Sequence, residues 1–215
     1  MRRLAAFSLI AAPMLLLLSE AVSPDLSDDG RQSLATVAAE PLRLAAWVWI
    51  GILSAVLFIP AVVGIAHLRQ RRGGRLVALG AALGVIGSVG YAVHQALFMQ
   101  LPSMTSGDPA EMAAVYERQA GSPAVAVVTF LLFLVPLMVG LLVLGIGLYR
   151  AGVAPLWPAL AIALAILPSA VPLPIDLGYA SFALLVAGMG GYAWLVLRIP
   201  DRQWTAAPAE AVPAI

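Results

Sequence analysis

Long stretches without a charged residue are the feature that most constrains how this chain of 215 residues folds. A helix needs about 20 apolar residues to cross about 30 Å of hydrocarbon. Five uncharged stretches exceed that length, and a sixth, at the N-terminus, is 16 residues long. Lipid cannot form hydrogen bonds with the backbone groups at the edge of an open sheet. The uncharged stretches also lack the alternation of apolar and polar residues that is typical of strands in a membrane barrel. The sequence therefore predicts an all-α, polytopic membrane helical bundle with six transmembrane helices, at about 4–22, 44–67, 76–99, 124–148, 154–172 and 177–198.

The first segment has a second interpretation. Two arginines and an apolar run precede a small-x-small sequence at Ser19-Glu20-Ala21, which resembles a secretory signal peptide. Cleavage there would leave five spans. We expect the segment to be retained, because a signal peptide is uncommon on a chain that crosses the membrane many times.

The composition excludes several other classes of protein. Apolar residues make up 62% of the chain and charged residues 11%, against about 45–50% and about 25% in an average soluble domain. A soluble globular enzyme, a disordered chain and a nucleic-acid-binding protein are therefore excluded. The chain has no cysteine, which excludes thiolate chemistry, and its two histidines are too few for a histidine-rich metal centre. We predict no metal and no cofactor.

The distribution of arginine predicts the orientation. With the N-terminus in the cytoplasm, nine of the twelve arginines lie inside, and only Arg31, Arg43 and Arg118 lie outside. The positive-inside rule favours this orientation in the inner membrane, with both termini cytoplasmic. We expect residues 1–200 to form one bundle domain and residues 201–215 a disordered cytoplasmic tail.

A basic turn joins the second and third predicted spans. Its sequence, RQRRGGR, supplies candidate ligands for anionic lipid head groups, namely Arg69, Arg71, Arg72 and Arg75. The simpler interpretation is that these arginines only fix the topology.

Each of the two outer loops carries signals for a short helix. Asp-Pro-Ala-Glu at 108–111 has the form of a capping box with proline at the first helical position, and Gly121 is a plausible stop. A similar start at 27–30 precedes a stop at 40–41. We predict two short helices on the outer membrane surface or over the bundle, which act either as binding elements or as lids without a ligand.

Small and polar residues share one broad face of the third predicted span. Small residues let helices approach closely, so this face should point into the bundle. Its members are Gly80, Gly84, Gly87, Ser88, Tyr91, His94, Gln95 and Phe98. The three glycines Gly188, Gly190 and Gly191 predict a second close contact in the last span.

Several ionisable residues lie at the outer ends of their spans. His94 is about 27 Å along the helix from Leu76, which places it near the outer boundary. Ionisable groups in spans are costly and often functional. We therefore expect one outward-facing polar cluster, in which Glu20 pairs with Arg43 or His94; the alternative is an interfacial ring of ordinary charges. The candidate members are Glu20, Arg43, His94, Gln95 and Asp176.

The whole pattern resembles a group of uncharacterised six-span bacterial integral membrane proteins of the domain-of-unknown-function type. The resemblance is carried by LLLLSEAVSP (15–24), AEPLRLAAW (39–47), the stretch from Pro60 to Leu76, and GIGLYRAGVAPLWPAL (145–160). It implies the topology, and it implies neither a reaction nor functional residues.

Two functions from different classes follow. The first is a non-enzymatic integral membrane protein that binds lipid, a protein partner or a second copy of itself. The alternative is a small transporter or permease subunit with an outward-facing polar site. Phosphate-binding loops, nucleophile elbows and zinc-protease motifs do not occur, so a membrane enzyme is the weakest interpretation. A polar cavity that reaches the middle of the membrane would favour transport, and a solid apolar bundle would favour the first function.

Overall fold

The computed structural model describes residues 2–27, 29–68, 74–170, 178–200 and 204. Throughout this part of the chain the regular structure is helical, and no strand occurs in it. The elements are α1 Arg2–Ala21, α2 Gly30–Ala39, α3 Pro41–His67, α4 Gly74–Leu97, η1 Phe98–Gln100, α5 Leu101–Met104, α6 Pro109–Ala120, α7 Pro123–Ala126, η2 Val127–Leu134, α8 Val135–Arg150, α9 Trp157–Ala170 and α10 Gly178–Arg198.

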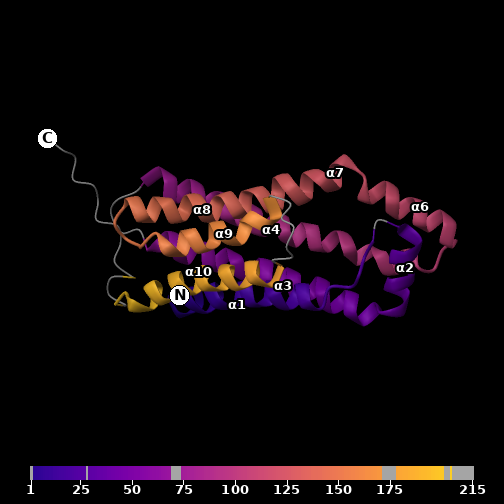
Figure 1. Cartoon of the computed structure of the whole chain (residues 1–215), viewed down its shortest axis with the longest axis horizontal. Helices are drawn as coiled ribbons and strands as arrows, with labels where there is room; N and C mark the ends of the chain where they lie inside the picture. Colours follow the sequence, from indigo (N-terminus) through magenta and orange to yellow (C-terminus); the bar gives the residue numbers. More distant parts are fainter. Residues whose placement is uncertain (1, 28, 69–73, 171–177, 201–203, 205–215) are drawn as a thin grey trace.

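The long helices pack side by side as a closed ring. In order around the ring they are α1, α3, α4, α8, α9 and α10, and α10 packs back against α1. The helices run side by side along the length of the molecule (Figure 1). The prediction of an all-α helical bundle is confirmed. The order around the ring follows chain order, and the ring closes where α10 packs against the N-terminal helix α1.

Five helical segments are long and apolar enough to cross a membrane. They are Arg2–Ala21, Pro41–His67, Gly74–Met104, Pro123–Arg150 and Ala180–Arg198. The predicted span 154–172 contains α9, which has 14 residues, so a sixth crossing stays a prediction. The length and composition of these five helices are those of a membrane-spanning protein.

The interior of the ring is filled by large apolar side chains. Leu9, Phe58, Leu144 and Ile162, from four different helices, have no exposed surface. Large apolar residues are also exposed on the outside, and Phe7, at 61% exposed, is one of many. A continuous apolar exterior is unfavourable in water and favourable against hydrocarbon. These outward side chains therefore contact lipid when the helices are in a membrane.

Glycines bring α4 and α8 together at backbone distance. A Cβ added at Gly140 would lie 2.5 Å from the backbone nitrogen of Gly84 and 2.9 Å from the carbonyl oxygen of Gly80. Six members of the predicted face of α4 are buried and the other two, His94 and Phe98, are half-buried, so that prediction is confirmed. In α10, Gly188 and Gly191 contact α9, whereas Gly190 has open space beside it, so the prediction is wrong for Gly190.

The continuous helix from α7 to α8 changes its winding before Pro136. The segment Val127–Leu134 is a π-helix, in which the backbone N–H of Val135 bonds to the carbonyl of Phe130. Because proline has no N–H, the Leu132 carbonyl lacks the donor that an α-helix would supply four residues later. That carbonyl lies directly against Gly90 of α4. The π-helical segment thus lies where a proline interrupts the backbone hydrogen bonds of the helix.

The segments that follow α1 and α4 form a second group of short helices, which lies at the end of the molecule away from the N-terminus (Figure 1). We call residues 22–27, 29–44 and 98–126 the extension. Both predicted short helices, α2 and α6, are present in it. The extension has a small core of its own, made of Val37, Leu44 and Leu101 with Trp47 and Phe98 packed against it.

Candidate functional site

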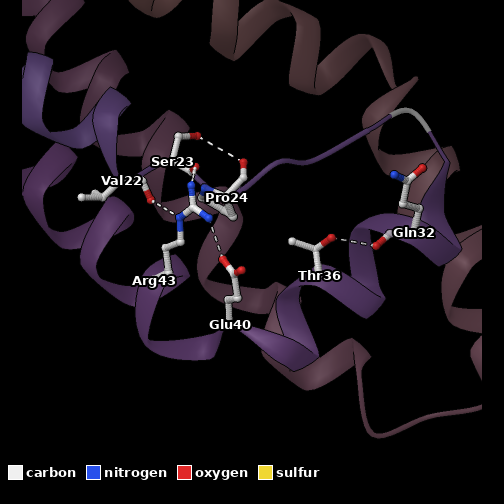
Figure 2. A network of polar contacts seen from close by, with 7 residues as sticks. All are labelled: Val22, Ser23, Pro24, Gln32, Thr36, Glu40 and Arg43. Carbon is white, nitrogen blue, oxygen red and sulfur yellow. Dashed lines mark hydrogen bonds and ion pairs between the residues drawn. The ribbon is translucent and has the colours of Figure 1, made fainter.

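Arg43, a member of the predicted cluster, is used to hold the end of α1. Its Nη1 donates to Glu40 Oε2 at 2.8 Å, its Nε to the carbonyl of Val22 at 3.2 Å and its Nη2 to the carbonyl of Ser23 at 2.9 Å (Figure 2). The last carbonyls of a helix lack intrahelical donors, and an arginine commonly supplies them. Figure 2 also shows that Glu40 is the acid that pairs with this guanidinium. The predicted partner Glu20 forms no ion pair with it in the described structure.

His94 and Gln95 point to different neighbours, because consecutive residues of a helix are rotated by about 100°. The Nδ1 of His94 shares a hydrogen bond of 3.0 Å with Thr129 Oγ1, and its ring stacks on Phe133. Gln95 instead packs against Gly51 of α3 and donates to the Tyr91 hydroxyl at 3.1 Å. The structure therefore divides these two predicted cluster members between the η2 side and the α3 side of α4.

The structure describes only one of the other two predicted members. Glu20 is exposed at the end of α1. Asp176 lies outside the described residues. Thr129 is a partner that the sequence analysis missed; its signal was a single polar residue within an otherwise apolar run of η2.

Gln95 is the most deeply buried amide in the site. It is 2% exposed, and within the described residues its Oε1 has no hydrogen-bond partner. Leaving a buried acceptor unsatisfied costs about 1–3 kcal/mol. Its surroundings, Gly51 and Tyr91, fill the space around the side chain, so this region is a packed polar seam between helices.

The predicted lipid-binding arginines are only partly described. Arg75 is exposed in the first turn of α4, and the other three lie outside the described residues. At the same end of the bundle, Arg2 donates to the carbonyl of Ile199, and His67 Nε2 lies 2.7 Å from the carbonyl of Trp204. Trp204 falls within the predicted tail and is buried.

In the extension, α2 and α6 are locked together at the start of α2. Asp29 caps α2 by accepting from the backbone N–H groups of Arg31 and Gln32. The N–H of Gly30 donates to Glu117 Oε1 of α6 at 3.2 Å. A Cβ at Gly30 would lie 2.5 Å from the carbonyl oxygen of Ala113, so only glycine permits this approach. Together these contacts fix α2 and α6 relative to each other.

A hollow of about 450 Å³ lies between α2 and the segment that joins α5 to α6. This volume is within the range of small-molecule sites, about 300–1,000 Å³. Most of its wall is apolar, and two charged residues of opposite sign contribute to it. The lining residues are Arg31, Leu34, Ala35, Ala38, Met104, Thr105, Gly107, Asp108, Pro109 and Ala110.

The start of α6, which forms one wall of the hollow, has the capping geometry that the sequence predicted. Asp108 Oδ1 accepts from the N–H groups of Ala110 and Glu111, both at 3.0 Å. Pro109 occupies the first turn, and the helix ends before Gly121. The predicted boundaries of this helix are confirmed, whereas the hollow behind it had no signal in the sequence.

Among the described residues no group of three or more histidine, aspartate or glutamate side chains is placed to hold a metal ion. The fold is that of a helical bundle with five helices long and apolar enough to span a membrane, and it carries the extension at one end. Comparison of the chain with family models, curated proteins and solved structures finds no match in any of the three.

Proposed function

We propose that this chain is a non-enzymatic integral membrane protein that binds a small ligand in the hollow of its extension. The bundle acts as the membrane anchor, and α2 and α6 form the binding element. The positive-inside rule supports an inner-membrane location with the arginine-rich end in the cytoplasm and the extension outside.

The hollow is the observation that carries this proposal. Its volume of about 450 Å³ and its largely apolar wall are those of a ligand site. The ring below it is packed with fully buried side chains such as Leu9, Phe58 and Leu144. A solid core suits an anchor, because the bundle then keeps one arrangement while the extension exchanges its ligand.

The hollow can be filled by mutation without touching the bundle. Ala35 lines it, so Ala35→Trp places an indole where a ligand would lie, and Ala114→Trp on the exposed side of α6 is the matched control. A thermal-shift screen of the purified full chain against a small-molecule library should give ligands that stabilise the wild type and Ala114→Trp. The stabilisation should disappear in Ala35→Trp. If no ligand is lost on filling the hollow, the hollow is not the binding site.

The second candidate is a small transporter, and the buried polar seam favours it. Ser19 donates to the carbonyl of Trp47, Gln95 donates to the Tyr91 hydroxyl, and His94 shares a hydrogen bond with Thr129. Transporters place such groups beside interrupted helices, and η2 interrupts the α7–α8 helix here.

Access of water to the middle of the bundle separates the two candidates. The chain has no cysteine, so a single Ser88→Cys reports on the buried face of α4 without background. A membrane-impermeant thiol reagent should label Ala110→Cys in the extension and leave Ser88→Cys unlabelled. Labelling of Ser88→Cys at a comparable rate would favour transport.

A further inference from the structure

We propose that the hollow of the extension selects a small zwitterion with an apolar side chain, that is, a free apolar amino acid. This inference rests on the proposed function, because it names the class of ligand for the same hollow. It comes from the two charged residues on the walls of the hollow and from the apolar surface between them.

The two charges come from different elements. Arg31 belongs to the first turn of α2, and Asp108 is the N-cap of α6. Although both line the same hollow, they form no ion pair within 4.0 Å of each other in the described structure. Opposite charges that share a cavity and stay apart leave each one open to a group of the ligand.

Both charged groups have hydrogen-bonding capacity to spare. The backbone N–H of Arg31 is held by Asp29, whereas its guanidinium has no partner among the described residues. Asp108 uses Oδ1 for the two N–H groups of α6, which fixes the carboxylate in place. Its Oδ2 has no partner in the described part of the chain. A guanidinium recognises a carboxylate in a bidentate manner, and a fixed carboxylate oxygen accepts from an ammonium group.

The apolar part of the wall supplies the third contact. Leu34, Ala35 and Ala38 of α2 face Met104 across the hollow. Leucine and alanine side chains give a smooth apolar surface, and methionine adapts to the shape of what it contacts. An aliphatic or aromatic side chain buried there contributes favourable free energy in proportion to its apolar area.

The pairing of charges argues against a simple anion or a simple cation. An anion on Arg31 would be repelled by Asp108, and a cation on Asp108 would be repelled by Arg31. A zwitterion satisfies both residues at once. A phospholipid with an ethanolamine head group carries the same charges, but the hollow lies in the extension beyond the end of α1, so such a lipid would have to leave the apolar spans to reach it.

Titration calorimetry on the purified full chain, in an uncharged detergent, tests the proposal. L-leucine, L-methionine and L-phenylalanine are the probes, and N-acetyl-leucine amide is the uncharged analogue. We expect the free amino acids to bind and the analogue to bind at least about tenfold more weakly, because it lacks both charge-assisted contacts. Equal binding of the analogue would overturn the proposal.

Two variants remove one charge each while preserving the fold. Asp108→Asn keeps a good N-cap residue for α6, and Arg31→Gln keeps a polar, unbranched side chain of good helix propensity in α2. Each should weaken binding of L-leucine by about tenfold or more. Glu111→Gln and Arg118→Gln are the matched controls, because each removes one negative or one positive charge from a residue of α6 that does not line the hollow. Both controls should bind L-leucine with unchanged affinity. Equal affinity in all four variants would contradict the role of the two charges.

The outcomes separate this inference from the proposed function. If ligands lost in Ala35→Trp are insensitive to Arg31→Gln and Asp108→Asn, the hollow is a ligand site and the zwitterion assignment is wrong. If no ligand is lost in Ala35→Trp, both fail. Binding of lysophosphatidylethanolamine together with no binding of the amino acids would overturn the assignment in favour of a lipid.

Discussion

The contact between α4 and α8 predicts that one added methyl group destabilises the bundle. In Gly140→Ala the new Cβ would meet backbone atoms only, at 2.5 Å from Gly84 N, 2.9 Å from Gly80 O and 2.9 Å from the carbonyl carbon of Leu83. Ordinary van der Waals contact begins at 3.4 Å. The two helices must therefore separate by about 0.9 Å at this point, because the three nearest atoms are all backbone atoms, which cannot move aside as a side chain can.

The cost follows from two opposing effects. Overpacking a tight interface costs about 1–3 kcal/mol, and replacing glycine by alanine within a helix returns about 0.5–1 kcal/mol. We expect Gly140→Ala to lower the free energy of unfolding by about 1–2 kcal/mol. Gly190→Ala is the matched control, because a Cβ there meets nothing within 4 Å. That variant should be as stable as the wild type or slightly more stable.

Reversible unfolding in a titration with a denaturing detergent, followed by circular dichroism, measures both variants against the wild type. Each protein should first be shown to be monodisperse and equally helical before titration. If Gly140→Ala is as stable as Gly190→Ala, the helices do not meet at backbone distance, and the packing described for α4 and α8 is refuted.

Three further predictions concern other parts of the molecule. Tyr192→Phe should leave the bundle equally stable or make it more stable in the same titration, because the buried Tyr192 hydroxyl has no hydrogen-bond partner among the described residues and an unsatisfied buried hydroxyl costs about 1–3 kcal/mol; a marked loss of stability would reveal a partner. Thr129→Val keeps the shape and removes the bond to His94, so it should cost about 0.5–1.5 kcal/mol by the same measurement, and an unchanged midpoint would contradict that bond. Ala110→Cys in intact cells should react with a membrane-impermeant maleimide, and Ala151→Cys should react only after permeabilisation; labelling of both from the same side would contradict the orientation.

The fold could be predicted in large part because its signals are local. The charge-free stretches contain the long helices, and Asp108 with Pro109 marks the start of α6 correctly. The glycine face of α4 pointed into the bundle as predicted, because small residues at helical spacing have few uses other than close approach. Gly190 was the exception, since three glycines within four residues cannot all lie on one face of a helix.

The candidate site could be predicted much less well. The expected cluster paired Glu20 with Arg43 or His94 because all three lie near the outer ends of their spans, whereas Arg43 lies three residues from Glu40 and within reach of two free carbonyls. His94 and Gln95 were placed together on one broad face, and the structure gives each its own neighbour. A sequence shows that a polar side chain is present near a boundary and does not show which helix faces it.

By itself the sequence determined that the chain is a bundle of apolar helices with a short capped helix in each long loop, because hydrophobic length and helix caps act within a single segment. Only the tertiary structure decided that the helices close into a ring, that η2 winds as a π-helix against Gly90, and that Arg31 and Asp108 line one hollow. Each of these depends on which faces of separate segments meet. Packing between residues far apart in the chain decides which faces meet, and no local sequence pattern indicates it.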